Sequence, residues 1–187
     1  MGWIEIPTLE AKRLRLRPLR RSDLDDYAAM YANREVLRHL GAGPDPWDRG
    51  RAWRHLSYAI GHWQLAGFGN WAIEHRETRA FLGVVGFCGP EGWPAIELAG
   101  ILMPPYWGKG YAIESALAAL NCWFIDWQKD NVISLVHPEN HASIRLVERI
   151  GETLQGRIQH LGREMLCYGI DRESYERQHG LNQRMAS

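Results

Sequence analysis

The sequence contains few cysteines and no excess of charge of either sign. Its three cysteines, Cys88, Cys122 and Cys167, are widely spaced and form no Cys-x-x-Cys pair. This argues against a disulfide framework or a zinc site and is typical of a reducing compartment. Basic and acidic residues both number 22, so the basic excess that whole-surface binding to nucleic acid or membranes requires is missing. We expect a cytoplasmic protein with no metal site and no nucleic-acid or membrane partner.

The sequence also lacks a segment typical of a membrane span or a leader. Residues 55–73 contain no Asp, Glu, Lys or Arg, but their histidines, glutamine, asparagine and three glycines disfavour a spanning helix. The start, 1–5, has no basic region followed by an apolar run, so we expect no signal peptide. Repeats, low-complexity tracts and linkers are missing too, and 187 residues favour one domain.

Hydrophobic periodicity predicts helices and strands in the first half of the chain. Residues 12–19 alternate, which indicates a strand with one buried face. We interpret its arginines as a solvated face rather than a phosphate-binding patch. Ser22 and Asp25 resemble a capping box that opens a helix. After a Gly- and Pro-rich break at 41–47, a second helix ends at the glycines of 67–69. Its apolar face carries Trp53, Leu56, Ile60 and Trp63.

The second half of the chain continues as a mixture of strands and helices. Apolar runs predict strands at 71–75, 81–88, 95–103 and 132–136, and a closing hairpin at 153–158 and 165–170. The clearest helical period covers 113–127. A further helix is capped by Asn140 and ends at Gly151. The polar tail from residue 178 is expected to fray. These patterns predict one mixed α/β domain.

A glycine loop between the 95–103 strand and the 113–127 helix predicts an anion site. Its residues are Trp107, Gly108, Lys109, Gly110, Tyr111 and Ala112. Glycines at the first turn of a helix let backbone N–H groups point at a phosphate or pyrophosphate, with the helix dipole behind them. A P-loop would need Ser or Thr where Gly110 stands. A dinucleotide fingerprint would need a small residue at Ile113 and an acid after a second strand.

This loop and a second motif together resemble the GCN5-related N-acetyltransferase (GNAT) superfamily. The loop matches its pyrophosphate motif, Q/R-x-x-G-x-G/A, with Trp107 in the Gln/Arg position. Residues 138–145 resemble the P-x-N-x-x-S-x-R signature of the ribosomal-protein Nα-acetyltransferase (RimJ/RimL-like) branch, and 148–151 its E-x-x-G ending. Glu152 stands where the family usually has an aromatic. The resemblance implies an α+β fold over residues 1–187: a single domain with a twisted, mostly antiparallel sheet flanked by helices on both faces.

The resemblance also implies acetyl-CoA as acyl donor. In relatives, the strand before the loop offers backbone groups to the pantetheine arm, and loop amides hold the pyrophosphate. The implied cofactor-binding residues are Ile101, Leu102, Trp107, Gly108, Lys109, Gly110, Tyr111, Ala112, Asn140 and Ser143. Lys109 is either a phosphate contact or a solvated loop lysine. Asn140 is both a good helix N-cap and an implied cofactor contact.

Amide formation from an amine and a thioester needs a proton acceptor, because the amine arrives largely protonated. Glu97 interrupts an apolar strand, where the pKa of a carboxyl rises, and this suits a general base acting directly or through a water. The alternative is an edge-strand acid in solvent. The oxyanion needs donors, most simply a backbone N–H of the same strand. Val147 replaces the tyrosine that many relatives use, which leaves Ser143 to assist the thiolate, unless Ser143 is an ordinary helix N3 residue. We interpret the eight histidines as core or surface residues.

Tryptophan is abundant, with nine residues in 187. The candidate acceptor segments, 41–63 and 89–94, are rich in tryptophan and poor in acids, which suggests Trp47, Trp63 and Trp93 as acceptor-site residues. We therefore predict an N-acetyltransferase that works in a ternary complex as a monomer or homodimer. Its acceptor would be a protein N-terminus or a small aromatic or apolar amine. The alternatives are a non-catalytic CoA-binding sensor or partner-binding module, and a polyamine or aminoglycoside acetyltransferase.

Overall fold

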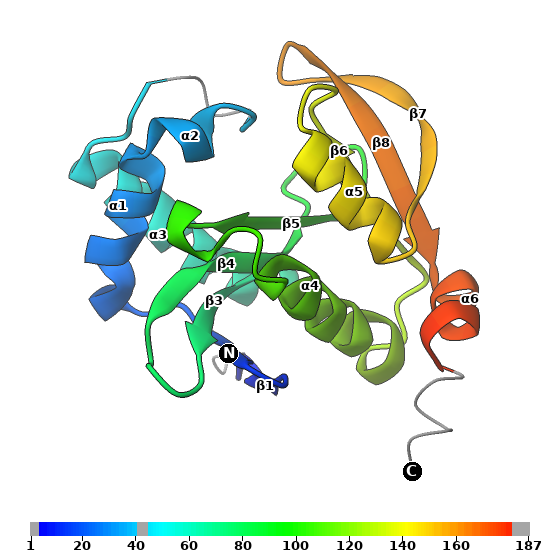
Figure 1. Ribbon diagram of the computed structural model, residues 1–187, viewed down its shortest axis with the longest axis horizontal. Helices are drawn as coiled ribbons and strands as arrows, with labels where there is room; N and C mark the ends of the chain where they lie inside the picture. The colour runs from blue at the N-terminus through cyan, green and yellow to red at the C-terminus, as the bar shows by residue number, and fades with distance from the viewer. Residues whose placement is uncertain (1–3, 41–44, 181–187) are drawn as a thin grey trace.

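An eight-stranded sheet organises the chain, in the spatial order β1-β2-β3-β4-β5-β6-β8-β7 (Figure 1). The structure, a computed structural model, describes residues 4–40 and 45–180. Neighbouring strands are antiparallel except β5 and β6, which run parallel and are joined through α4. The strands are β1 (Leu9–Glu10), β2 (Leu14–Pro18), β3 (Asn70–His75), β4 (Phe81–Cys88), β5 (Glu97–Leu102), β6 (Asn131–Val136), β7 (Thr153–His160) and β8 (Arg163–Asp171).

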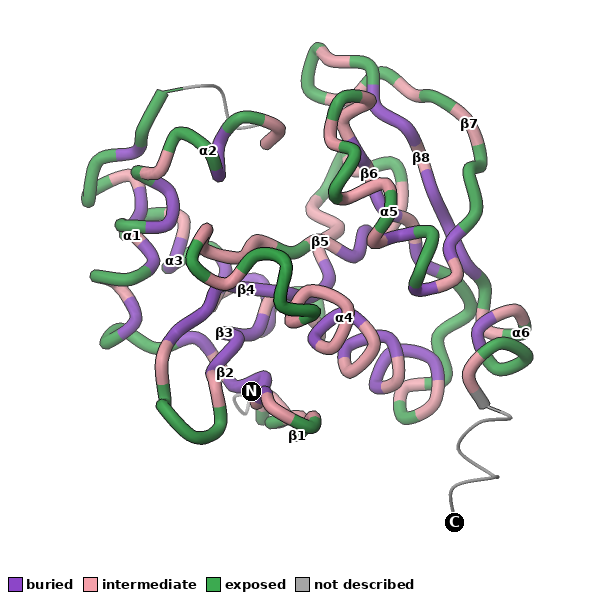
Figure 2. Tube along the Cα trace, in the orientation of Figure 1, coloured by how far each residue is buried: buried purple, intermediate pink, exposed green. Residues whose placement is uncertain are grey.

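Helices cover both faces of this sheet, which confirms the expected α+β fold class. Helices α1, α2 and α3 pack on one face of the β2–β5 half. Helix α4 covers the other face, and α5 continues that layer over β6 and β8 (Figures 1 and 2). The helices are α1 (Leu24–Ala32), α2 (Arg34–Leu37), α3 (Arg49–Ala66), α4 (Tyr111–Asn121), α5 (His141–Arg149) and α6 (Arg172–Tyr175). Shorter helical turns cover Arg21–Asp23, Pro104–Tyr106, Cys122–Asp126 and Glu176–Gly180.

Several expected boundaries are confirmed. The Asn140 side chain accepts a hydrogen bond from the Ser143 backbone N–H (3.2 Å) and so caps α5. Gly67 ends α3 in the left-handed conformation (φ 81°). The continuous period over 113–127 divides into α4 and a π-helical turn at Cys122–Asp126. Part of the expected 41–47 break and of the tail from 178 lies outside the described residues, at 41–44 and 181–187.

Two expectations about side chains in the first half of the chain were wrong. Trp53 is 44% exposed, because the buried stripe of α3 is centred on Leu56, Ala59 and Trp63 and leaves Trp53 at its edge. Arg17 is not solvated but only 6% exposed.

The burial of Arg17 depends on carboxylates from two other segments. Its guanidinium donates to Asp23 through two nitrogens (2.8 Å each) and to Glu74 through Nε (2.6 Å). Asp23 also accepts a hydrogen bond from the Arg20 backbone N–H (2.8 Å) and thereby closes the turn before α1. The expected capping box of Ser22 and Asp25 is therefore replaced by this contact. A buried guanidinium requires such paired carboxylates.

Candidate active site

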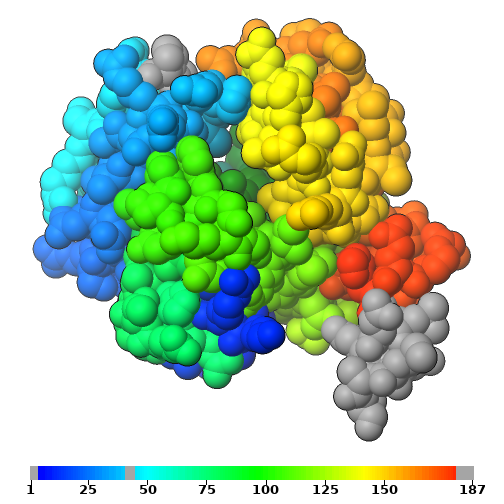
Figure 3. Space-filling view, in the orientation of Figure 1, coloured from blue at the N-terminus to red at the C-terminus, as the bar shows by residue number. Residues whose placement is uncertain are grey.

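The sheet opens between β5 and β6, and this opening is the centre of the site. The two strands pair only at Glu97 and Ile133, where the Ile133 N–H donates to the Ile96 carbonyl (3.0 Å). Gly100, in the middle of the sheet, is exposed as a result. Figure 3 shows a hollow here, between α5 (yellow) and the green and blue segments opposite, with the green of β4 and β5 at its floor.

Side chains take over where the backbone ladder stops. The next acceptor along β5, the Leu98 carbonyl, receives a hydrogen bond from the Ser134 hydroxyl (3.1 Å) instead of a backbone N–H. The Leu135 backbone N–H, which would continue a regular parallel ladder, bonds to the Glu97 carboxylate. Glu97 and Ser134 thus allow the strands to separate without leaving these backbone groups unpaired.

Backbone groups of β5 face the opening beyond this point. The Met103 N–H donates to the Leu82 carbonyl of β4. Because successive residues of a strand point their N–H and C=O groups to opposite sides, Ile101 also faces β4. The backbone groups of Leu98, Gly100 and Leu102 therefore face the gap between β5 and β6. The Leu102 carbonyl accepts from the Trp107 indole (2.7 Å), and the Gly100 N–H is left facing the opening. It is the backbone donor best placed to contact an oxyanion there.

Glu97 lies at the start of this opening, on the face that α1–α3 cover. Its side chain is only 9% exposed. The Trp93 indole N–H donates to its Oε2 (2.7 Å), and the Cys88 thiol lies at 3.6 Å from the same oxygen. An indole N–H can only donate, so this contact favours the ionised carboxylate.

The pKa of Glu97 is raised, and opposing causes determine by how much. Burial, the largest, raises the pKa by disfavouring the charged form, while hydrogen bonds from Trp93, Leu135 and Cys88 oppose the shift. A carboxylate with a raised pKa that still accepts three hydrogen bonds has the properties of a general base. The expectation that Glu97 is buried and not an edge-strand acid in solvent is thus confirmed, and its catalytic role stays a prediction.

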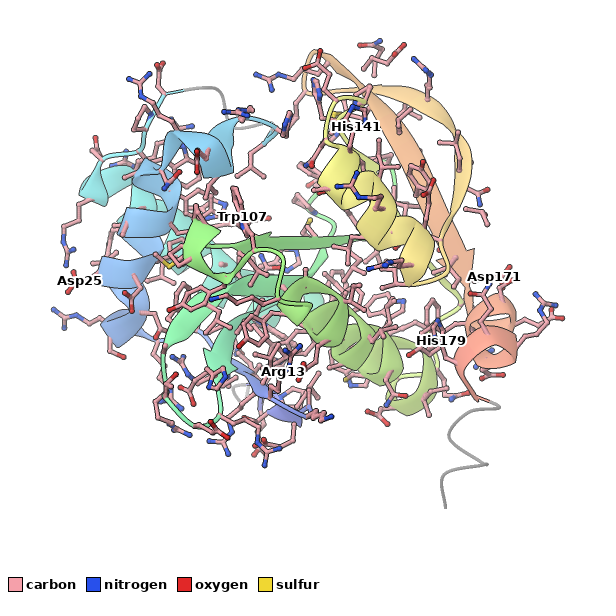
Figure 4. The ribbon with its side chains drawn as sticks, viewed as in Figure 1. Arg13, Asp25, Trp107, His141, Asp171 and His179 are labelled. Carbon is pink, nitrogen blue, oxygen red and sulfur yellow. The ribbon has the colours of Figure 1, made fainter. Side chains whose placement is uncertain are left out.

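The glycine loop that the sequence predicts to bind an anion lies beside the same opening. Gly108 (φ 72°) and Gly110 (φ 79°) are left-handed, which is strained for other residues. They turn the chain into α4, which begins at Tyr111, and the first N–H groups of a helix have no partner within it. Lys109 is exposed on this loop. Figure 4 shows Trp107, which is 46% exposed, on the same loop.

Arg13 holds this loop against the start of α4, a role that the sequence pattern did not suggest. Its Nε donates to Glu114 Oε2 (2.7 Å), and its Nη1 donates to the Lys109 carbonyl (2.9 Å). Its guanidinium also covers the Tyr111 ring at 4.4 Å from the ring centre. Figure 4 shows Arg13 below α4. The partners lie about a hundred residues apart in the sequence, so no local signal could have paired them.

Helix α5 places the other candidate residues on the opposite wall of the opening. Asn140 caps the helix, and Ser143 lies in its first turn, half-buried. Ser143 shares a helical stripe with Leu146 and Ile150, both of which contact the core beneath α4. Ser143 therefore lies on the side of α5 that faces α4. Val147 is buried against β6 and β8.

The three candidate acceptor-site tryptophans have different surroundings. Trp93 is half-buried and contacts Glu97, and His160 packs edge-on against its ring (4.3 Å between centres). Trp47 stacks on Tyr31 (4.1 Å) and its indole nitrogen has no hydrogen-bond partner in the described part of the chain. Trp63 is 1% exposed and its indole donates to the Asn70 carbonyl, so it has no surface left for an acceptor and we assign it to the core.

A second buried carboxyl, Glu152, lies close to the opening and was not expected to take part. It is 2% exposed and its Oε1 lies 2.9 Å from the Ser134 hydroxyl. Burial, the main cause, raises the pKa of Glu152 to about 8. The hydrogen bond with Ser134 opposes the shift, and the charge of nearby Glu97 adds to it. The only signal in the sequence was the unusual residue type after Gly151.

Two wider searches cover only residues 4–40 and 45–180. In that part of the chain no cluster of three His, Cys, Asp or Glu side chains is arranged to hold a metal ion. No helix in the same residues is long and apolar enough to span a membrane.

Known proteins resemble this chain in sequence and in structure. A family model described as "Acetyltransferase (GNAT) domain" matches residues 13–153. The crystal structure of an acetyltransferase from Agrobacterium tumefaciens str. C58 has a TM-score of 0.79 and 30% identity, covering 91% of this chain and 97% of that one. YkkB of Bacillus subtilis (strain 168) is 33% identical over 107 residues, or 56% of this chain and 61% of YkkB. The chain thus spans less than two thirds of that relative.

Two further solved structures are described with different acceptors. One is a putative ribosomal-protein-serine acetyltransferase from Vibrio cholerae (TM-score 0.74, 15% identity, 91% and 99% of the two chains). The other is spermidine N-acetyltransferase from Vibrio cholerae in complex with CoA and spermine (TM-score 0.73, 21% identity, 87% and 98%). At these identities they show the fold alone. The family model, however, covers most of the chain: this protein belongs to the GNAT acetyltransferase family, whose members are acetyl-CoA-dependent acyltransferases.

Proposed function

We propose that this protein transfers an acetyl group from acetyl-CoA to a primary amine by direct attack in a ternary complex, with Glu97 as the general base. The observation that carries the proposal is the position of Glu97, a buried carboxylate where β5 and β6 separate. Acetyl-CoA would enter from the side of α4 and α5, with its pyrophosphate on the 108–112 amides. The acceptor amine would enter from the side of α1–α3, which Glu97 faces.

The reaction follows from these positions. The ammonium form of the acceptor gives up one proton before attack, because only a free lone pair can attack the thioester carbon. Glu97 takes up a proton from the nitrogen. The C–N bond forms while charge develops on the carbonyl oxygen, which the Gly100 N–H would stabilise. The C–S bond then breaks, the nitrogen releases its remaining excess proton, and this proton passes to the leaving thiolate with the assistance of the Ser143 hydroxyl. Glu97 returns its proton to solvent.

The surroundings of Glu97 favour an acceptor with an aromatic or apolar environment next to its amine. Trp93 and His160 pack together beside the carboxylate, and Tyr31 stacks on Trp47 on the same side of the sheet. We therefore propose a protein N-terminus or a small aromatic or apolar amine as the acceptor. A terminus also agrees with the 138–145 motif, which resembles the RimJ/RimL-like branch. The spermidine acetyltransferase with the same fold makes a polyamine the second candidate.

Titration calorimetry with CoA and acetyl-CoA tests the first requirement of this proposal, which is that the protein binds the cofactor. Binding of both is expected, and no binding would contradict it. Thiol release from acetyl-CoA is then measured with three acceptor groups: peptides that differ in their first residues, aromatic amines, and spermidine. Turnover with peptides or aromatic amines supports the proposed acceptor. Turnover with spermidine alone assigns the polyamine class, and binding without turnover assigns a CoA-binding module.

Replacing Trp93 by phenylalanine is expected to move the rising limb of the pH–rate profile to higher pH. The indole N–H stabilises the ionised form of Glu97. Without it the pKa of Glu97 rises further, while the ring keeps its packing. The pH dependence of kcat/KM for the amine measures the shift. Trp53→Phe, at an exposed position of α3, is the matched control, and an unmoved limb in Trp93→Phe would show that Glu97 does not set it.

Replacing Arg13 by glutamine is expected to weaken acetyl-CoA binding about tenfold, because the glycine loop loses its contacts to Glu114 and the Lys109 carbonyl. Calorimetry with CoA measures the change. Arg76→Gln, a half-exposed arginine of the β3–β4 turn, is the control and should bind CoA like the wild type. Equal affinity of Arg13→Gln and wild type would exclude the loop-fixing role.

A further inference from the structure

Glu152 occupies an unusual position for a carboxyl. Gly151 (φ 96°) turns the chain at the end of α5, and the Glu152 N–H closes that turn on the Val147 carbonyl (2.9 Å). The side chain then points beneath α5 to Ser134 of β6, on the face of the sheet opposite to Glu97. Its second oxygen, Oε2, is buried and has no hydrogen-bond partner among the described residues.

The hydroxyl of Ser134 lies between two oxygens but has only one proton to donate. One neighbour is the Leu98 carbonyl (3.1 Å), which can only accept. The other is Glu152 Oε1 (2.9 Å). Both contacts are hydrogen bonds at the same time only when Glu152 carries a proton and donates it to the Ser134 oxygen. An ionised Glu152 would compete with Leu98 for the single hydroxyl proton.

We infer that Glu152 is a positioning residue that acts as a neutral carboxylic acid: it donates to Ser134, which in turn donates to the Leu98 carbonyl and fixes the point where β5 and β6 separate beside Glu97. This inference rests on the proposed function, since that point is where the acyl group would be transferred. The two carboxyls have opposite surroundings. Glu97 meets donors, which favour its ionised form, whereas Glu152 meets a hydroxyl whose proton is already used.

The groups around Glu152 agree with the neutral form. Two titratable side chains interact electrostatically with the Glu152 carboxyl, Glu97 of β5 and Cys167 of β8. Both are negatively charged when ionised. From α5, the Val147 carbonyl accepts a hydrogen bond from the Glu152 backbone N–H. His179, in the C-terminal turn, bonds to the Ile150 carbonyl (3.2 Å) and not to Glu152. Burial and the negative charge of Glu97 thus act in the same direction, and together they outweigh the Ser134 hydrogen bond, which lowers the pKa, and raise it to about 8.

Loss of the Glu152 proton should therefore disturb catalysis at alkaline pH. The wild-type kcat is expected to fall by up to tenfold between pH 8 and 10, because the Ser134 proton moves from Leu98 to the ionised carboxylate. Glu152→Gln cannot ionise, and its amide N–H still donates to Ser134. This variant should keep most of the activity at pH 7 and lose the alkaline fall. Ser134→Ala should lower kcat about tenfold, with less than threefold change in the Kd of CoA.

The experiment combines these rates with a titration that does not need activity. Carboxyl carbon NMR of glutamate-labelled protein, with the Glu152 signal assigned by its absence in Glu152→Gln, should show titration near pH 8. Glu173→Gln, at an exposed site on α6, serves as the control and should match the wild type throughout.

The outcomes separate this inference from the proposed function. Titration of Glu152 below about pH 5.5, or an alkaline fall that persists in Glu152→Gln, would overturn the positioning role even in an active enzyme. If the wild type neither binds CoA nor turns over any amine, the proposed function fails. The NMR titration would then still show whether Glu152 carries its proton in the folded protein.

Discussion

Replacing Glu97 by glutamine is expected to lower kcat by about 10²–10⁴-fold, with the affinity for acetyl-CoA unchanged. The amide has the same size as the carboxyl and its oxygen can still accept from Trp93, but it cannot take a proton from the acceptor nitrogen. The wild-type rate rises with pH as Glu97 loses its proton. In the variant the rise of the rate with pH should reflect only the ionisation of the amine itself. Steady-state kinetics from pH 6 to 10, with CoA calorimetry, measure both effects.

The defect should also become smaller at high pH. Above the pKa of the acceptor, about 8 for an α-amine, the free amine is abundant and the need for a base before attack falls. A variant whose rate stays equal to that of the wild type with every amine would remove Glu97 from the mechanism. A variant with lost CoA affinity would point instead to a disturbed β5, because Glu97 also accepts from the Leu135 backbone.

The second large effect concerns stability, which is expected to fall between pH 5 and pH 8 because of Glu152. Folding raises its pKa from 4.5 to about 8. Below pH 4.5 both states carry the proton. As the pH rises, the unfolded chain releases its proton while the folded protein keeps it, so stability is lost until the folded state also ionises. At 1.36 kcal/mol per pKa unit, the loss is at most about 5 kcal/mol.

Denaturant unfolding at several pH values measures this effect. Glu152→Gln has no proton to release, so the difference between its free energies of unfolding at pH 5 and pH 8 should be smaller by several kcal/mol than in the wild type. Glu97, whose pKa is also raised, contributes to the slope in both proteins, so the comparison between them isolates Glu152. Glu173→Gln should have the wild-type slope. Equal slopes for wild type and Glu152→Gln would mean that Glu152 is ionised in the folded protein.

The sequence alone predicted the fold class and the place of the anion site, because both depend on local patterns. Alternation and helical period follow from which face of an element is buried, and they indicated the strands and the helix on each side of the glycine loop. Gly108 and Gly110 were recognisable because left-handed backbone strongly favours glycine. Glu97 was visible as a single acid in an apolar strand, and Asn140 as a helix cap. These residues carry their signals within a few neighbours.

Tertiary structure decided the partners of charged and polar side chains. Arg17 was expected in solvent but is held by Asp23 and Glu74, and Arg13 pairs with Glu114 of α4. Trp63 was a candidate for the acceptor site and lies in the core. Such contacts join residues that are far apart in sequence, and neither hydrophobic period nor residue type records them.

The same holds for the protonation state of the site. Glu152 was visible in the sequence only as an unusual residue after Gly151. Its neutral form follows from a hydroxyl with one proton and two oxygen neighbours, Leu98 and Glu152 itself, brought together by three separate segments. The sequence therefore determined which chemical groups this protein carries and where the glycine loop lies. The folded structure decided the surroundings on which the proposed base and acid roles of the two carboxyls rest, because burial and hydrogen-bond partners, not residue type, set a pKa.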